Sequence, residues 1–209
     1  YWKVRNFFIN KLCNLSFHEI QTLSFIDESL NQIFNPELKS VNVINPIDKT
    51  QESMRTNLYS TLINTFIFNL DKHSYSGKYF EVNNTYDKAS HSKYKSIPNQ
   101  NYKLGILIPK KITDNNDQVY TIQDLASTLR MLLPKVQFSK LSKPGFHKNN
   151  SYLITINDSP IGHMGQLSYA TQHQLNINED IFLAEINLEA LEFNSLISYD
   201  YKPLSQYPF

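Results

Sequence analysis

The stretch SMRTNLYSTLINTFIFNLD, residues 53–71, decides how this sequence folds. Its apolar side chains recur three and four residues apart, which predicts an amphipathic helix over residues 57–71. The apolar face of this helix is formed by Leu58, Leu62, Ile63, Phe66, Ile67 and Leu70. A face this broad must be buried against another layer of the fold, so we expect the helix to cover a sheet.

Arg55 stands just before this helix. A positive charge at the start of a helix opposes the positive end of the helix macrodipole. Something must therefore hold the guanidinium in place, and a carboxylate, a backbone carbonyl oxygen or a ligand could do so. Of these we favour a structural ion pair over a ligand contact.

Four elements are expected on the N-terminal side. They are, in order, a helix over residues 2–15, a strand over 19–25, a helix over 29–34 and a strand over 40–44. Asp27 and Glu28 stand where the short helix would begin, and Pro36 ends it. The pair Asn45-Pro46 then marks a turn.

Strands dominate the C-terminal side. The expected elements are a strand over 78–82 with a hairpin partner at 85–86, a strand over 104–108, a helix over 121–133, a hairpin with arms over 152–156 and 161–167, a strand over 182–186 and a short helix over 188–191. Residues 88–101 and 115–117 are expected to be loops. Strands that follow one another outnumber strand–helix–strand crossovers, which is typical of the α+β class. We therefore expect a single domain over residues 1–209, an antiparallel β-sheet flanked by helices.

Composition limits the classes of function. The 209 residues carry 20 basic and 19 acidic side chains, a formal net charge of +1, so the overall positive field of a free-standing nucleic-acid binder is missing. No apolar stretch approaches the about 20 residues needed to span a bilayer. The single cysteine, Cys13, cannot form an internal disulfide, which fits a reducing, cytoplasmic compartment.

The sequence contains no motif for catalysis or metal binding. Five glycines cannot build a phosphate-binding loop or a dinucleotide fingerprint, and no two histidines stand at a metal-ligand spacing. Gly162 and Gly165 have the spacing of an RNA-clamping loop, but a hairpin arm is their expected place, where glycines allow close packing. We interpret Glu185 and Glu189 as a strand-end pair without a shared catalytic role. No catalytic residue and no metal ligand is therefore assigned.

Several short motifs, taken in their order along the chain, resemble those of the phenylalanyl-tRNA synthetase β chain. The resemblance is carried by Asn45-Pro46, by Met54-Arg55-Thr56-Asn57-Leu58 with the long helix after it, by Phe80-Glu81-Val82-Asn83, by Lys143-Pro144-Gly145, by Ile161-Gly162-His163-Met164-Gly165 and by residues 201–208. It runs over nearly the whole chain. It departs from the family at Phe146-His147 and at Ser168-Tyr169, where the family has a different loop and a His-Pro pair.

The resemblance implies a fold like the catalytic domain of a class II aminoacyl-tRNA synthetase, in a fragment of a longer β chain. It implies that this domain is a degenerate copy of the catalytic α subunit. The whole enzyme is an (αβ)₂ assembly that uses ATP and Mg²⁺ to attach phenylalanine to its tRNA in the cytoplasm. The implied partners are the α subunit and, in the full complex, tRNA; no membrane is expected.

The resemblance also implies that this copy is inactive. A class II site needs two arginines, because the α-phosphate of ATP gains charge in the transition state. The resemblance places Asn83 and Asn84 at the first of these positions and Glu185 near the second. We therefore expect this domain to bind neither ATP nor Mg²⁺. As a scaffold, it is expected to dock the α subunit largely through the apolar helix and sheet surfaces and to help place the tRNA. The positions that mark the fold and the degenerate site are Asn45, Pro46, Arg55, Glu81, Asn83 and Glu185.

Two alternatives stay open. One is a catalytically active class II ligase that uses Arg55 and the lysines of residues 88–95. The other is a free-standing RNA-binding module, against which the near-zero net charge argues.

Overall fold

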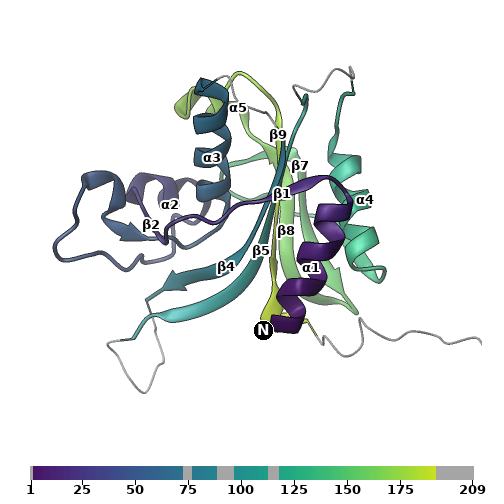
Figure 1. Cartoon of the computed structure of the whole chain (residues 1–209), viewed down its shortest axis with the longest axis horizontal. Coiled ribbons are helices and arrows are strands. Elements are labelled where there is room, and N and C mark those ends of the chain that lie inside the picture. Colours follow the sequence, from purple (N-terminus) through teal and green to yellow (C-terminus); the bar gives the residue numbers. More distant parts are fainter. Residues whose placement is uncertain (1, 73–76, 89–96, 113–117, 192–209) are drawn as a thin grey trace, which may run out of the picture.

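A seven-stranded sheet separates two layers of helices (Figure 1). The computed structural model describes residues 2–72, 77–88, 97–112 and 118–191. The strands lie in the order β1 (Phe17–Glu19), β4 (Lys78–Asp87), β5 (Asn99–Pro109), β9 (Ile181–Asn187), β8 (Ser159–Leu167), β7 (Phe146–Ile156) and β6 (Val136–Lys140). β1 pairs with β4 in parallel, and every other neighbouring pair is antiparallel. The predicted α+β fold is confirmed, with one short parallel strand added at the edge of the sheet.

Helices cover both faces of this sheet. α1 (Trp2–Asn14) and α4 (Ile122–Leu132) lie on one face, and α3 (Tyr59–Asp71) lies on the other with α2 (Glu28–Phe34) and α5 (Tyr169–Gln174) (Figure 1). The smaller elements are the paired strands β2 (Phe25–Ile26) and β3 (Ser53–Met54) and the 3-10 turns η1 (Lys49–Gln51) and η2 (Leu188–Ala190). Within the described ranges, no helix is long and apolar enough to cross a membrane.

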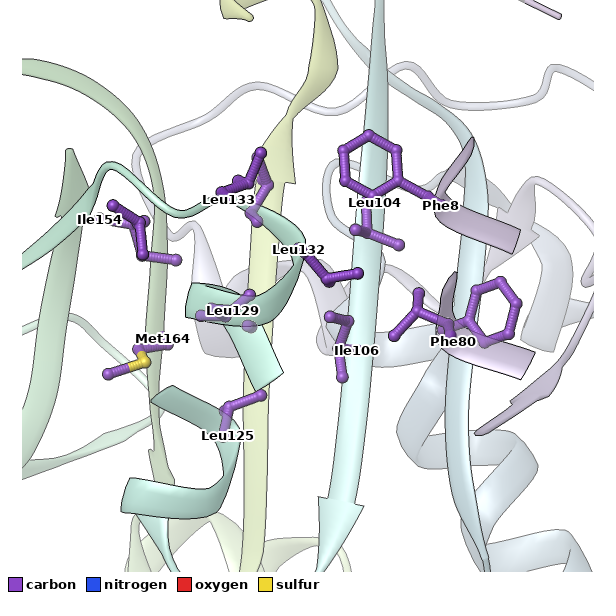
Figure 2. Packing of buried hydrophobic residues seen from close by; sticks show 14 of the residues in the cluster. Phe8, Phe80, Leu104, Ile106, Leu125, Leu129, Leu132, Leu133, Ile154 and Met164 are labelled. Carbon is purple, nitrogen blue, oxygen red and sulfur yellow. The ribbon is translucent and has the colours of Figure 1, made fainter. Parts of the chain in front are cut away.

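The face covered by α1 and α4 holds the larger core. Figure 2 shows Phe8 of α1 and Leu129 of α4 packed over Phe80 and Ile106 of the sheet. All four side chains are fully buried. Burying large apolar side chains on both sides of a sheet is the main stabilising term for such a fold.

The opposite face is covered by α3. Its side chains in the second core are Tyr59, Leu62, Ile63 and Phe66. The helix approaches the sheet closely at Gly105 of β5, where a Cβ would lie 2.8 Å from side-chain atoms of both Leu58 and Leu62. The expectation that this helix covers a sheet is confirmed, and most of its apolar face is buried within the chain.

The predictions of strands over residues 19–25 and 40–44 are wrong. The strand β1 ends at Glu19. Farther along, the carbonyl of Ser24 accepts the N–H of Arg55 at 2.9 Å, so this part of the segment bonds to the residues before α3 and not to the seven-stranded sheet. Residues 40–44 form only an isolated bridge between Asn42 and Ser53. Their side chains after residue 40 are not buried, and Ile44 is 93% exposed, so no core holds a strand here.

The hairpin expected around Asn83 and Asn84 is also wrong. β4 continues to Asp87, with Asn83 opposite Lys103 and Asn84 opposite Tyr102 of β5. These polar residues resemble a turn in the sequence, but pairing with a long neighbouring strand keeps them extended. β5 begins at Asn99, so the expected loop is shorter than 88–101. Residues 89–96, 113–117 and 192–209 lie outside the described residues. The loop expected at 115–117 and the motif at 201–208 therefore also lie outside them.

Local signals predicted several other features correctly. The carboxylate of Asp124 accepts the N–H of Thr121 at 2.7 Å, which closes the first turn of α4. The turn between β7 and β8 falls at Asn157 and Asp158, whose φ angles of 50° and 61° lie in the left-handed region that two-residue hairpins require. Asn187 begins η2 by accepting the N–H of Glu189.

Candidate functional site

A buried ion pair joins Arg55 to Glu81. Nη1 of Arg55 lies 2.9 Å from Oε1 of Glu81, and the two side chains are 0% and 1% exposed. Nε of Arg55 donates to the carbonyl oxygen of Asn84 at 2.9 Å, and Nη1 also donates to Oγ1 of Thr22 at 2.8 Å. The interpretation of Arg55 as one half of a structural ion pair is confirmed.

Neutral donors surround the carboxylate of Glu81. The hydroxyl groups of Thr22 and Thr61 donate to it at 2.9 and 3.0 Å, and the side-chain amide of Asn83 donates at 3.0 Å. A buried ion pair is stable only when such additional hydrogen bonds satisfy its oxygens. The pair therefore ties together the segment after β1, the first turns of α3 and the middle of β4.

Apart from Glu185, the predicted site residues separate into two groups. Arg55, Glu81 and Asn83 meet in this network, and Asn83 does so from the middle of a strand. Asn45 and Pro46 are exposed in the segment before η1. No contact between this turn and the network is found in the part of the chain that the structure describes.

Glu185 of β9 caps helix α3. Leu58 at the N-cap position of α3 provides no side-chain hydrogen bond. Instead, Oε1 of Glu185 accepts the backbone N–H of Leu58 at 2.7 Å, across 127 residues of sequence. A carboxylate at this end of a helix also interacts favourably with the macrodipole. Glu185 and Glu189 share no site, because Glu185 is buried in this contact whereas Glu189 is exposed.

Lysines neutralise Glu185. Nζ of Lys103 lies 2.8 Å from Oε2 of Glu185. Burial alone would raise the pKa of the Glu185 carboxyl, but the charges of Lys103 and Lys143, together with the hydrogen bonds from Lys103 and from the N–H of Leu58, lower that pKa below its usual value. The carboxylate is therefore ionised at neutral pH.

A pocket of about 530 Å³ opens beside this carboxylate. Its polar lining includes Lys103, Lys143, His163 and Glu185. Neither lysine was predicted from the sequence as a site residue. Lys103 could have been found, because it stands two residues before Gly105 and so shares the α3 side of β5. Lys143 lies in a loop between β6 and β7, where no periodic pattern indicates a direction.

The chain has only three arginines, and none projects into this pocket. Arg5 of α1 pairs with Glu19, and Arg130 of α4 lies over the ring of Phe138. Both helices cover the opposite face of the sheet, and Arg55 is enclosed with Glu81. Among the described residues, no group of three or more histidine, cysteine or acidic side chains could hold a metal ion.

Gly162 and Gly165 have the packing role expected of them. A Cβ at Gly162 would lie 2.1 Å from the carbonyl oxygen of Glu185, and a Cβ at Gly165 would lie 2.6 Å from the ring of Phe146. The glycines therefore let β8 approach its neighbours closely and do not form an exposed loop.

The chain matches the model of a known protein family. The model of the family described as "Phenylalanyl tRNA synthetase beta chain CLM domain" matches residues 1–188. The phenylalanine–tRNA ligase β subunit of Legionella pneumophila (strain Lens) is 28% identical over 200 residues, which cover 92% of this chain and 24% of the relative. The corresponding subunit of Fusobacterium nucleatum is 27% identical over 207 residues, 94% of this chain and 26% of the relative. The chain thus spans about a quarter of the length of these relatives.

A solved structure shares the fold. The pyrrolysyl-tRNA synthetase PylSc of Desulfitobacterium hafniense superposes with a TM-score of 0.68 at 14% identity, over 90% of this chain and 64% of that chain. At this identity the likeness concerns the fold alone, which is that of a class II synthetase.

Proposed function

Because the chain belongs to the family of phenylalanyl-tRNA synthetase β-chain CLM domains, we propose that it is a non-catalytic, class II synthetase-like scaffold domain. In this proposal it docks the α subunit and helps to place tRNA during ATP-dependent phenylalanylation of tRNA in the cytoplasm. ATP and Mg²⁺ are bound by the whole enzyme elsewhere. The domain takes part in a ligase without performing the chemical step.

The complete burial of Arg55 carries the proposal. Class II chemistry needs exposed arginines to hold the phosphates of ATP. Arg55 is the only arginine on the α3 side of the sheet, and its guanidinium is bound to Glu81 with no exposed surface. Glu185 stands near the position where the resemblance places the second arginine, and its carboxylate, bound by Lys103 and by the N–H of Leu58, offers no positive charge to a phosphate group. This arrangement opposes the alternative of an active ligase that uses Arg55; the lysines of its proposed partner loop lie mostly in residues 89–96, outside the described residues.

The docking surface that we propose for the α subunit lies in the segment of residues 23–47. Five large apolar side chains of this segment are exposed, namely Leu23, Phe25, Leu38, Ile44 and Ile47. Ile44 and Ile47 are 93% and 99% exposed. Concentrated apolar exposure is typical of protein interfaces. The apolar face of α3, which was expected to serve docking, is instead buried against the sheet.

The docking proposal is tested by assembly. The full-length protein should co-elute with the α subunit in size-exclusion chromatography with light scattering. The double variant Ile44→Asp, Ile47→Asp should lose this association, because charges would be placed at the centre of an apolar contact. The matched control is Met131→Asp on α4, where the side chain is 53% exposed on the other face of the sheet. Equal assembly of both variants would refute the proposed surface.

A further inference from the structure

The pocket beside Glu185 has features of a binding site that the scaffold role does not require. Its volume of about 530 Å³ lies in the range of small-molecule sites. Its lining includes the aliphatic residues Leu141, Leu153, Pro160 and Ile161. It also includes the two lysines, Glu185 and His163. Apolar residues combined with a few charged groups are the usual lining of a site for a small organic molecule.

The charges in this pocket sum to one positive charge. Lys103 and Glu185 neutralise each other through their 2.8 Å contact. The ammonium of Lys143 has no hydrogen bond or salt bridge with any described residue; it lies 5.3 Å from the centre of the Tyr59 ring. Lys143 therefore supplies the surplus charge, and its pKa is lowered because the side chain is partly buried. A partly desolvated ammonium with no anion in direct contact is unfavourable, and an anionic ligand would relieve that cost.

His163 adds no charge to the pocket at neutral pH. The hydroxyl of Ser151 donates to the carbonyl oxygen of Leu141 at 2.6 Å, so its oxygen is left to accept from Nε2 of His163 at 3.0 Å. This pair of bonds fixes the neutral tautomer with its proton on Nε2. Burial, with the charge of Lys143, lowers the pKa of His163 to about 4. His163 therefore does not change the charge of the pocket across the physiological pH range.

We propose that this pocket binds a small aliphatic monocarboxylate, with its carboxylate on Lys143 and its hydrocarbon part against Leu141, Leu153 and Ile161. A single surplus charge suits a monoanion and not a di- or triphosphate. A free amino acid fits less well, because its ammonium would need a carboxylate in the pocket. The one carboxylate there, Glu185, is already bound by Lys103 and by the N–H of Leu58. The inference is independent of the scaffold role.

A matched series of three probes tests the chemistry by isothermal titration calorimetry of the full-length protein. The probes are 4-methylpentanoate, its uncharged amide, and leucine, which adds an ammonium to the same skeleton. We expect saturable binding of 4-methylpentanoate and binding at least about tenfold weaker for the amide and for leucine, from the loss of one charge-assisted contact. No saturable binding of the carboxylate, or equal binding of carboxylate and amide, would overturn the proposal.

Variants and protection locate the site. Lys143→Met should weaken binding of 4-methylpentanoate about tenfold or more, whereas the exposed control Lys148→Met should leave it unchanged. In the wild type, 4-methylpentanoate should slow acetylation of Lys143 by acetyl N-hydroxysuccinimide ester but not that of Lys148, as read by peptide mass spectrometry. The protection measurement needs no variant and so stands even where Lys143→Met folds poorly. Unchanged binding in folded Lys143→Met, or no selective protection of Lys143, would place the carboxylate elsewhere and reject the site.

Discussion

The guanidinium of Arg55 and the carboxylate of Glu81 lie 2.9 Å apart, and neither side chain reaches solvent. Arg55 lies between β3 and α3, whereas Glu81 lies in the middle of β4. The pair therefore connects the segment that leads into α3 with the sheet that this helix covers. An arginine held in this way stabilises the fold and is not available to a phosphate.

Removing one partner of this pair should unfold the protein more readily. Arg55→Ala leaves the Glu81 carboxylate buried without its counter-charge, so we expect a loss of about 3–5 kcal/mol in the free energy of unfolding. Chemical denaturation followed by circular dichroism measures this loss. The double variant Arg55→Met, Glu81→Leu removes both charges and should be more stable than Arg55→Ala alone. A folded, fully stable Arg55→Ala protein would instead support a role of Arg55 in ligand binding.

The cap that Glu185 forms on α3 should depend on pH. Glu185→Gln removes a charge-assisted hydrogen bond to the N–H of Leu58 and should cost about 1.5–3 kcal/mol at neutral pH. The folded state lowers the pKa of this carboxyl, so its stabilisation is present at neutral pH and is lost as the pH falls through the folded pKa. The difference between wild type and variant should therefore shrink in acid. Urea titrations at neutral and at acidic pH measure this difference in the free energy of unfolding, with the exposed Glu37→Gln as control. A difference that grows in acid would contradict the assignment.

Gly162 should not tolerate a methyl group. A Cβ at this position would lie 2.1 Å from the carbonyl oxygen of Glu185 in the neighbouring strand, and backbone cannot move as a side chain can. We expect Gly162→Ala to lower the free energy of unfolding by about 1–3 kcal/mol or more. Thermal denaturation provides the measurement, and Ser159→Ala at the exposed start of β8 serves as control. An unchanged melting temperature would show that β8 and β9 are not packed as described.

The first turn of α4 depends on Asp124. Its carboxylate accepts both the N–H and the hydroxyl of Thr121 at 2.7 Å. Asp124→Ala should therefore cost about 1 kcal/mol, the usual contribution of a helix cap. Gln123→Ala, exposed in the same turn, should be nearly neutral. Denaturant titration compares the two, and equal effects would argue against the cap.

Signals that depend on neighbouring residues predicted their structures well. The apolar period of residues 57–71, the cap at Thr121 and the turn at Asn157-Asp158 act over a few residues, so the sequence alone reveals them. The sequence also predicted that Arg55 has a structural partner. It could not name Glu81, because that contact depends on how α3 and β4 meet in space.

The wrong predictions concern residues whose structure depends on contacts with distant parts of the chain. Asn83 and Asn84 have the composition of a turn, yet the pairing of β4 with β5 determines their conformation. Val41 and Val43 give residues 40–44 the alternation of a strand, yet both side chains are only partly buried and the segment pairs through a single isolated bridge from Asn42 to Ser53. The pocket was missed because it joins Lys103, Lys143, His163 and Glu185 from four separate segments. Only the sheet order brings these segments together.

The proposed function requires that this class II-like domain does not itself activate an amino acid. Phenylalanine-dependent exchange of pyrophosphate into ATP, measured for the full-length protein without the α subunit, tests this requirement. We predict no exchange above the protein-free blank, because no arginine is available to hold the α-phosphate. Exchange that rises with protein concentration and disappears in a folded Arg55→Ala or Lys143→Met variant would contradict the account.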